Sequence, residues 1–310
     1  MIDGPIVECV PNFSEGTDAG KIHEIVRSMH VDGVHLLDFS MDPDHNRSVV
    51  TIAGAPEAVV EAAVRGAGKA AELIDLTKQN GVHPRIGAAD VIPFVPCSGI
   101  SLGQCAMLAR QAGMAIWRRF GVPVYFYEAA ATRPDRVNLE DVRRGQFEGL
   151  LTDSTKDTMR RPDVGGPGLH TTAGASAVGA RKFLIAYNVY LVSTVPDLSV
   201  PVSVARAIAK DIRASNGGLL GVKAMGVVAN GRAQVSMNIT DFQQTPMGKV
   251  FETVATFGRK HGAEIDGGEL IGLIPEQAYE ANAEWVRQTV EFDPERKVLE
   301  RRLKHPLDWP

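Results

Sequence analysis

The stretch that decides the fold runs from residue 224 to residue 239: Ala224-Met225-Gly226-Val227-Val228-Ala229-Asn230-Gly231-Arg232-Ala233-Gln234-Val235-Ser236-Met237-Asn238-Ile239. Two strand-like runs, 224–229 and 233–239, stand on either side of the dipeptide Asn230-Gly231. Asn-Gly is the favoured pair of a two-residue type I′ turn, because both central residues of that turn need positive φ angles. The stretch therefore predicts a β-hairpin.

The segments around this hairpin extend it into a domain. Residues 182–192 are typical of a long strand, and residues 200–214 are typical of a helix. After the hairpin, Pro246 begins an expected helix that ends near His261, and a weaker strand follows at 263–265. The resulting order, βαββαβ, is that of ferredoxin-like domains.

The first half of the chain begins with the same order and then adds further elements. Its expected strands and helices are 6–10, 18–30, 34–37, 48–52, 56–75, 91–95, 101–120, 122–127 and 138–147. Ser101 is the expected N-cap of the helix at 101–120, and Gly121 is expected to end it. We therefore predict an α/β (α+β) fold with two subdomains, residues 1–182 and 183–310. Each is expected to be a mixed β-sheet with helices on its outer face.

Composition limits the classes of protein to which the chain can belong. Its 33 basic and 37 acidic residues give a formal net charge of −4, so no basic field is available to hold nucleic acid. It shows neither a basic leader nor an apolar run of the length that spans a bilayer. Cys9, Cys97 and Cys105 lack metal-ligand spacing and are expected to be reduced. We expect a cytoplasmic protein with no nucleic-acid or membrane partner.

The segment Gly81-Val82-His83-Pro84-Arg85-Ile86-Gly87-Ala88-Ala89-Asp90 carries the strongest chemical signal. It places an imidazole, a guanidinium and a carboxylate within eight positions, directly before an expected strand. Pro84 biases His83 towards an extended conformation, which aims the imidazole before a ligand arrives. An imidazole that titrates near ~6.5 can accept and donate a proton at neutral pH. The segment therefore predicts an active-site loop capable of proton transfer.

Three charged residues near this loop have open roles. Arg85 is expected either to pair with a substrate carboxylate through its planar fork or to hold Asp90 in an ion pair that closes the loop. Asp38, at the end of an expected strand, either orients His83 or a substrate ammonium group, or is a turn residue. The loop at residues 42–47 contains two aspartates and a histidine, but it lacks the glycine and distal glutamate of an EF-hand. We expect no metal site.

A glycine-rich stretch precedes the second subdomain. Its residues are Gly165, Gly166, Pro167, Gly168, Leu169, His170, Thr171, Thr172, Ala173 and Gly174. Glycines let backbone amides approach a ligand closely, and the two threonines add hydroxyl donors. The stretch does not have the Gly-x-Gly-x-x-Gly pattern of dinucleotide-binding loops. Taken alone, such a stretch is more typical of a linker.

Several segments together resemble the glutamate formimidoyltransferase (formiminotransferase) family. They occur in the family's order between residue 6 and about residue 280, and they are Ile6-Val7-Glu8-Cys9-Val10-Pro11-Asn12-Phe13-Ser14-Glu15-Gly16, Leu36-Leu37-Asp38, Asn46-Arg47, His83-Pro84-Arg85 with Gly87 and Asp90, Gly179 to Asn188, Gln234-Val235-Ser236-Met237-Asn238 and Leu270-Ile271-Gly272-Leu273-Ile274-Pro275. His-Pro-Arg alone would carry little weight, whereas this many matches in order is a specific signal.

The resemblance implies an enzyme of histidine degradation. The reaction moves the formimino group of N-formimino-L-glutamate to N5 of tetrahydrofolate, the co-substrate, and releases L-glutamate. The resemblance implies that His83 is the catalytic base, that residues 165–174 bind the folate, and that the protein is a homodimer. It also implies a single-domain, bacterial-type member without the cyclodeaminase domain of the mammalian relatives.

Two departures keep other functions open. Ser40 and Ala173 stand where mammalian members have an acidic residue and a tryptophan. The Asp-x-Ser pattern at 38–40 leaves formyl transfer between 5-formyltetrahydrofolate and glutamate as the nearest alternative. An alternative of another class is a non-catalytic folate-binding protein, which would bind reduced folate without turnover. An assay that compares formiminoglutamate with formylglutamate separates the two enzymes.

Overall fold

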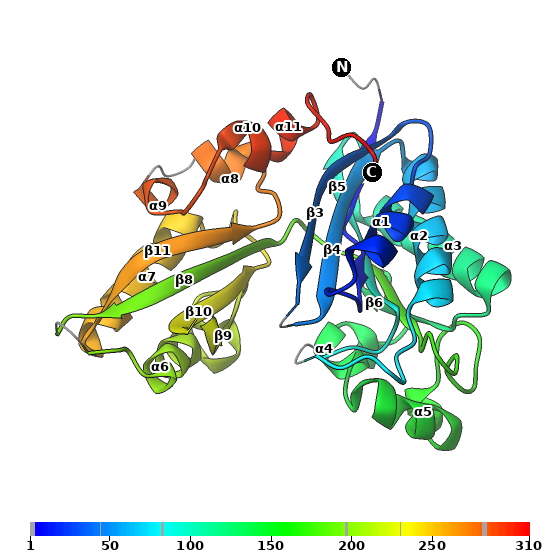
Figure 1. The fold of residues 1–310 in the computed structure, drawn as a ribbon, viewed down its shortest axis with the longest axis horizontal. Coiled ribbons are helices and arrows are strands. Elements are labelled where there is room, and N and C mark those ends of the chain that lie inside the picture. The colour runs from blue at the N-terminus through cyan, green and yellow to red at the C-terminus, as the bar shows by residue number, and fades with distance from the viewer. Residues whose placement is uncertain (1–3, 44, 82–83, 196–197, 230, 281–283) are drawn as a thin grey trace. The chain divides into compact units, whose positions relative to one another are not determined.

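A computed structural model describes residues 4–310 apart from 44, 82–83, 196–197, 230 and 281–283. The chain divides into two compact units (Figure 1). Unit 1 is Met1–Arg181 together with Pro306–Pro310, and unit 2 is Lys182–His305. Both units combine a β-sheet with helices, so the expected α/β class is confirmed.

Unit 1 is built on a mixed sheet of seven strands. Its elements are β1 (Ile6–Cys9), β2 (Asn12–Phe13), α1 (Ala19–Ser28), β3 (Val34–Asp42), β4 (Arg47–Gly54), α2 (Pro56–Leu73), β5 (Ala89–Ser98), α3 (Leu102–Phe120), β6 (Val124–Glu128), α4 (Leu139–Val142), α5 (Gln146–Lys156) and β7 (Ser176–Ala180). The strand order is β1-β4-β2-β5-β7-β6, with β3 paired to β4. β7 runs parallel to both β5 and β6, and the other pairs are antiparallel.

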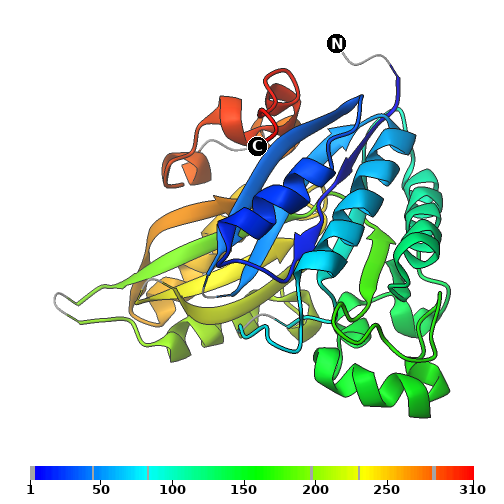
Figure 2. The ribbon, with the colours of Figure 1, turned by 45° about the vertical axis from the view of Figure 1, so that its right-hand side comes forward.

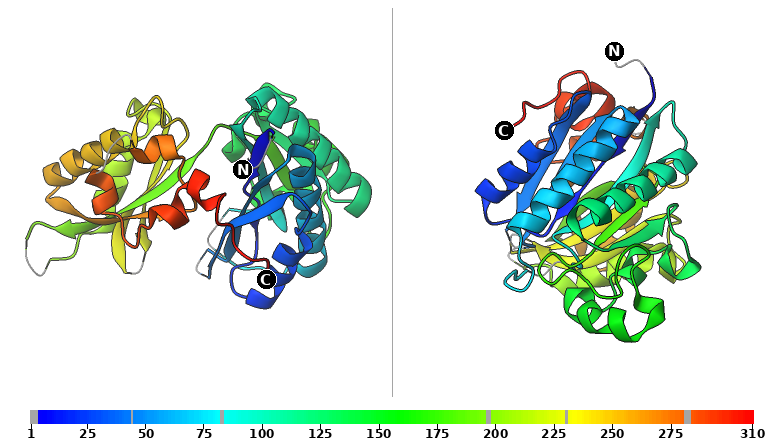
Figure 3. Two further views of the ribbon diagram at one scale, coloured as in Figure 1. Left: turned by 90° about the horizontal axis from the view of Figure 1, so that it is seen from above. Right: turned by 90° about the vertical axis from the view of Figure 1, so that its right-hand side faces the viewer.

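The long helices of unit 1 cover one face of this sheet. Figures 2 and 3 show α1, α2 and α3 side by side on that face, where their apolar residues form one buried core with alternate strand residues. Ser101 caps α3 through a capping box with Gln104, and Gly121 ends the helix in the left-handed conformation at φ 67°. Both boundary predictions for this helix are confirmed.

Two predictions for the chain after β6 were wrong. The single helix expected at 138–147 is two helices, α4 and α5, because Gly145 between them adopts a φ of 84°. The strand β7 was not expected at all. Its sequence, Ser-Ala-Val-Gly-Ala, has too few large apolar residues to show a strand pattern, yet every one of its residues is buried.

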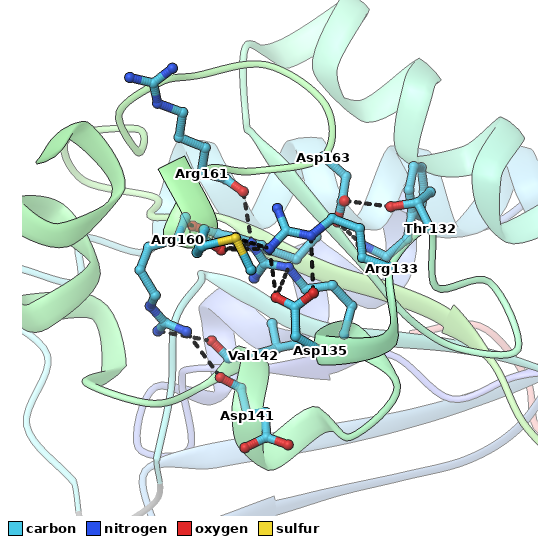
Figure 4. A network of polar contacts seen from close by, with 12 residues as sticks. Thr132, Arg133, Asp135, Asp141, Val142, Arg160, Arg161 and Asp163 are labelled. Carbon is cyan, nitrogen blue, oxygen red and sulfur yellow. Dashed lines mark hydrogen bonds and ion pairs between the residues drawn. The ribbon is translucent and has the colours of Figure 1, made fainter. Parts of the chain in front are cut away.

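A network of arginines holds the connection that carries α4 and α5 (Figure 4). Arg136, only 1% exposed, donates to the carbonyls of Met159 and Arg161 at 2.7 and 2.9 Å, and its guanidinium lies 4.7 Å from the centre of the Tyr125 ring. Arg160 donates to the carbonyl of Asp141 at 3.1 Å. Arg136 and Arg160 thus bind backbone oxygens of α4 and of residues 159–161, which holds these parts of the connection in place.

Unit 2 has the predicted βαββαβ order. Its elements are β8 (Ile185–Ser193), α6 (Val202–Ile212), β9 (Val222–Ala229), β10 (Arg232–Ile239), α7 (Met247–Lys260) and β11 (Ala263–Ile271), followed by the short helices α8 (Glu276–Glu280), α9 (Glu284–Arg287), α10 (Pro294–Lys297) and α11 (Leu299–Arg302). The sheet has the order β11-β8-β10-β9 and all its pairs are antiparallel, so the prediction of a mixed sheet in both subdomains was wrong for unit 2. α6 and α7 pack on the face that carries Ile185, Tyr187, Val235 and Met237. β11 is longer than the expected strand at 263–265.

The end of the chain lies with unit 1, although the second subdomain was expected to run to residue 310. The N–H of Leu307 donates to the carbonyl of Leu36 at 2.8 Å, which adds a bridge to the edge strand β3. The ring of Trp309 stacks on His30 with a centroid distance of 5.1 Å. The edge of β3 offers an unpaired carbonyl to Leu307 and the ring of His30 offers a face to Trp309, which explains why the last residues pack on unit 1.

Candidate active site

The chain is rigidly held two residues after His83, which itself lies outside the described residues. Residues 85–88 exchange backbone hydrogen bonds with three distant segments. These bonds run from Ser14 N to Ala88 O, from Ala88 N to Ala173 O, from Ala175 N to Ile86 O and from Phe147 N to Arg85 O, each at 2.9 Å. The predicted catalytic loop therefore continues into a fixed support rather than a loose connection.

Two glycines allow this support to form. Gly87 and Gly174 face each other in a backbone bridge. A Cβ at Gly87 would overlap the carbonyl oxygen of Ala175, and a Cβ at Gly174 would overlap that of Ile86. Gly174 also adopts a φ of 69°, which other residues rarely do. The close crossing joins the predicted catalytic segment to the end of the predicted folate loop.

Asp90 fixes the same segment from the side. Its carboxylate is 1% exposed, accepts a hydrogen bond from the N–H of Ile86 at 2.7 Å and forms an ion pair with Arg143. Arg47 lies near this pair. Burial lowers the pKa of the Arg47 guanidinium and the like charge of Arg143 lowers it further, while Asp90 and Asp42 oppose both effects. Two guanidinium groups thus lie beside the loop together with the carboxylates of Asp90 and Asp42.

Of the two roles predicted for Arg85, the ion pair with Asp90 is wrong, since Asp90 pairs with Arg143. Arg85 instead forms a two-pronged pair with Glu148 of α5, at 2.8 Å to Oε1 and 3.3 Å to Oε2. Its Nη2 also donates to the carbonyl of Gln79 at 3.1 Å. The side chain of Arg85 is 10% exposed. The fork of Arg85 is therefore already engaged within the protein, and its pairing with a substrate carboxylate stays a prediction.

Asp38 lies on the sheet face opposite the three long helices. It pairs in register with Thr51 of β4, whose neighbours Val50 and Ile52 point into the helix-side core. Asp38 is half-buried within β3 and is not a turn residue. Among the described residues its carboxylate has no hydrogen-bond partner. Ser40, two positions further along, is exposed on the same face, opposite Val49.

The glycine-rich stretch has an ordered second half. The ring nitrogen Nδ1 of His170 accepts from the N–H of Ala173 at 3.0 Å, and His170 and Gly174 exchange two backbone bonds of 2.9 Å. Ala173 is 1% exposed and belongs to the helix-side core. Its side chain therefore packs in the core, and its place in the predicted folate-binding set stays a prediction.

The first half of the glycine-rich stretch and Thr171 are exposed to solvent. Gly165, Gly166, Pro167 and Thr171 are exposed. Among the described contacts, the amides of the glycines and of Thr171 donate to no other residue. Gly165 packs against the ring of Trp117 so closely that a Cβ there would lie 2.7 Å from a ring carbon. These positions fit a loop whose backbone amides meet a ligand.

Sequence reasoning missed the residues that hold the site together. Arg143 follows α4 as its C-cap and Glu148 lies in α5, both far along the chain from Asp90 and Arg85, and no local pattern marks them. Tyr127 was also missed. Its ring lies over Gly179, where a Cβ would be 2.5 Å from the ring, and burial raises the pKa of its hydroxyl well above the ordinary value although Arg181 and Arg143 lower it. The missing side chain of Gly179 in β7 makes room for this ring.

Other features of the described residues do not point to a second reaction site. A cavity of about 430 Å³ lies on the helix side, and Arg65, Lys69, Glu72 and Phe120 line it with His170 at its edge. Its charges pair locally, as Lys69 with Glu72 at 2.6 Å. No group of three or more His, Cys, Asp or Glu side chains in the described part of the chain could hold a metal. Within the same part, each helix is too short or too polar to cross a membrane.

Both units match known domain models. Residues 6–181 match the model described as "Formiminotransferase domain, N-terminal subdomain", and residues 186–302 match the model "Formiminotransferase domain". The two matches follow the division of the structure into two units.

Curated proteins resemble the chain over nearly its full length. A glutamate formimidoyltransferase from Streptococcus pyogenes is 42% identical over 301 residues, which cover 96% of this chain and 98% of that protein. One from Thermoplasma acidophilum is 41% identical over 303 residues, which cover 96% and 97%. The mouse formimidoyltransferase-cyclodeaminase is 38% identical over 282 residues, which cover 88% of this chain and 51% of the mouse protein.

Proposed function

The chain belongs to the formiminotransferase family, and from that premise we propose that it is a glutamate formimidoyltransferase. It transfers the formimino group of N-formimino-L-glutamate to N5 of tetrahydrofolate and releases L-glutamate, a step of histidine degradation. The observation that carries the proposal is that both units match the family in order, and that His83 and residues 165–174 lie within the first match.

The chemistry needs one group that both accepts and donates a proton. N5 of tetrahydrofolate attacks the formimino carbon, and a new C–N bond forms as N5 loses its proton. The bond from that carbon to the glutamate nitrogen then breaks, and the leaving nitrogen gains a proton. We assign both transfers to the imidazole of His83, because an imidazole can serve as base and acid near neutral pH.

The surrounding residues support this assignment by holding the loop and by supplying charge. Asp90 and the backbone of Ser14, Ala173 and Ala175 fix the segment that follows His83. Arg47 and Arg143 supply positive charge for the carboxylates of the substrate, and Arg85 keeps α5 in place through Glu148. Asp38, half-buried with no partner among the described residues, is proposed to orient His83 or the substrate.

Tetrahydrofolate is proposed to meet the loop at residues 165–174. The exposed residues Gly165, Gly166 and Thr171 fit this role, because their amides donate to no other described residue, while Ala173 and Gly174 are proposed to stabilise the loop. On family resemblance we also propose a homodimer that works in the cytoplasm, and sedimentation equilibrium tests the dimer.

The donor assay tests the reaction itself. Purified protein is incubated with tetrahydrofolate and either formiminoglutamate or formylglutamate, and the folate product is followed by its absorbance. We expect turnover with formiminoglutamate that exceeds turnover with formylglutamate. Faster reaction with the formyl donor would favour the formyl-transfer alternative, and binding of reduced folate without turnover of either donor would favour a folate-binding protein.

A further inference from the structure

The turn between β3 and β4 contains an asparagine in an unusual backbone conformation. Asn46 has a φ of 47°, in the left-handed region that residues other than glycine seldom adopt. Asparagine tolerates this region better than most residues do. The N–H of Asn46 donates to the carbonyl of Pro43 at 3.2 Å and so closes the turn. Because an asparagine and not a glycine stands here, the turn keeps a side chain that can bind other segments.

The side-chain amide of Asn46 joins two segments that are distant in the chain. Its Oδ1 accepts a hydrogen bond from the N–H of Gly16 at 2.8 Å. Its Nδ2 donates to the carbonyl of Asn80 at 2.7 Å. The side chain of Gln79 donates in return to the backbone carbonyl of Asn46 at 3.0 Å. Two of these bonds fix residues 79 and 80 on the turn, and the third fixes the turn on the segment that follows β2.

Close packing reinforces the hydrogen bonds on both sides of the turn. A Cβ at Gly81 would lie 2.6 Å from the carbonyl oxygen of His45 and 2.8 Å from the Cβ of Asn46. A Cβ at Gly16 would overlap the carbonyl oxygen of Asp42. The backbone at both glycines therefore lies directly against the turn, which a larger residue would prevent. The three segments form one packed unit.

The chain therefore enters the predicted catalytic loop from a fixed point. Asn46 holds residues 79–81 before His83, and Asp90 holds the segment after it. Both supports belong to unit 1. A catalytic group is efficient only when its supporting residues keep it in the productive geometry, and a small displacement caused by a distant residue lowers the rate strongly.

We propose that Asn46 is a positioning residue for the proton transfer assigned to His83, an inference that rests on the proposed function. Asn46 acts by fixing the first residues of the loop, through its bond to the carbonyl of Asn80, and it takes no part in the chemical step. Removing the side chain should therefore lower the rate of the chemical step and leave the binding of both substrates unchanged.

Asn46→Gly tests this role, because glycine keeps the left-handed turn and removes both side-chain bonds. With formiminoglutamate and tetrahydrofolate, we expect kcat to fall by about 10- to 100-fold while KM for each substrate stays near the wild-type value. Asn216→Gly is the control. Asn216 is an exposed residue of unit 2 whose Oδ1 accepts from Arg213 at 2.9 Å, and this variant should keep the wild-type kcat.

Asn46→Asp separates the contact with the loop from the contact with Gly16. Aspartate also tolerates the left-handed region and keeps an oxygen that can accept from Gly16, but an ionised carboxylate cannot donate to the carbonyl of Asn80. We expect this variant to have a higher Tm than Asn46→Gly and a similar loss of kcat. Wild-type kcat in Asn46→Asp would overturn the inference, and this holds even if Asn46→Gly does not fold.

A double variant with His83→Ala shows whether Asn46 acts through His83. If it does, Asn46→Gly should lower kcat when His83 is present and lower it no further when His83 is absent. The same factor in both backgrounds, or wild-type kcat in a folded Asn46→Gly variant, overturns the inference, and the turnover of the wild type still supports the proposed function. If the wild type turns over neither formiminoglutamate nor formylglutamate, the proposed function fails and the inference fails with it.

Discussion

The carboxylate of Asp90 accepts a hydrogen bond from the backbone N–H of Ile86 at 2.7 Å while it pairs with the guanidinium of Arg143. One buried side chain therefore ties the segment after His83 to helix α4. Removing its charge leaves Arg143 buried without its partner, and such changes typically cost about 3–5 kcal/mol. We expect Asp90→Asn to lower the free energy of unfolding in urea by about 3 kcal/mol, and to lower kcat because the loop loses its anchor.

The control for Asp90 is Asp141→Asn. Asp141 pairs with Arg144 at 2.7 Å, but both side chains are well exposed, at 40% and 76%. An exposed pair of this kind contributes about 0–1 kcal/mol. If both variants lowered the free energy of unfolding equally, the ion pair of Asp90 with Arg143 would contribute no more to stability than an exposed pair.

Gly174→Ala should be far more damaging than Gly217→Ala. Both glycines have a positive φ, 69° and 83°, so both variants carry the same backbone strain of about 1 kcal/mol. Only the new Cβ at Gly174 would overlap a carbonyl oxygen, that of Ile86, whereas nothing lies within 4 Å of a Cβ at Gly217. Thermal unfolding should show a clearly larger drop in Tm for Gly174→Ala, with a loss of activity. Similar decreases in Tm for the two variants would mean that the backbones at Gly87 and Gly174 do not pack closely.

Glu148→Gln should change the acid stability of unit 1. Partial burial raises the pKa of Glu148, but the hydrogen bonds from Arg85 outweigh it and hold the pKa below its ordinary value. Because the pKa is lower in the folded than in the unfolded protein, the ionised carboxylate stabilises the fold at pH values above the ordinary glutamate pKa of about 4.3. This stability is lost as the pH falls through the lower pKa of the folded state. The Tm of the wild type should therefore be slightly higher than that of the variant at pH 6, and the difference should disappear near pH 3. Glu57→Gln, an exposed residue of α2, should show no such trend.

The three cysteines should differ in their reactivity. Burial raises the pKa of the Cys105 thiol to about 11, and burial together with Glu8 raises that of Cys9 further above the usual range. Only a thiolate reacts readily, so Cys97, which is half-buried, should be labelled first by an aromatic disulfide reagent at pH 8. Rapid labelling of all three in the folded protein would contradict the burial of Cys9 and Cys105.

The sequence was sufficient where local rules decide the structure. The hairpin β9–β10 flanks Asn230-Gly231, α3 begins after Ser101 and ends at Gly121, and unit 2 follows the expected βαββαβ order. Caps and turns depend on the residues at hand, which makes them visible without a structure. The break between α4 and α5 could also have been found, since Gly145 stands near the end of the expected helix.

The partners of the site residues could not be found in this way. Asp90 and Arg143 are 53 positions apart, and Arg85 and Glu148 are 63 apart. The sequence does not show whether Asp90 pairs with Arg85 or with Arg143, because the folded structure determines which side chains meet. Strand β7 was hidden for a related reason, because its small residues are required by the Tyr127 ring above Gly179 and not by any strand pattern.

Turnover of the His83→Ala variant is the most direct test of the central claim. Wild type and variant are compared with formiminoglutamate and tetrahydrofolate over pH 5.5 to 8.5, with equal Tm values as the check on folding. If His83 transfers the proton, kcat should fall by about 10²- to 10⁴-fold and the wild-type dependence on a group titrating near ~6.5 should disappear. Near-normal turnover by the folded variant, with the same pH profile as the wild type, would contradict the account.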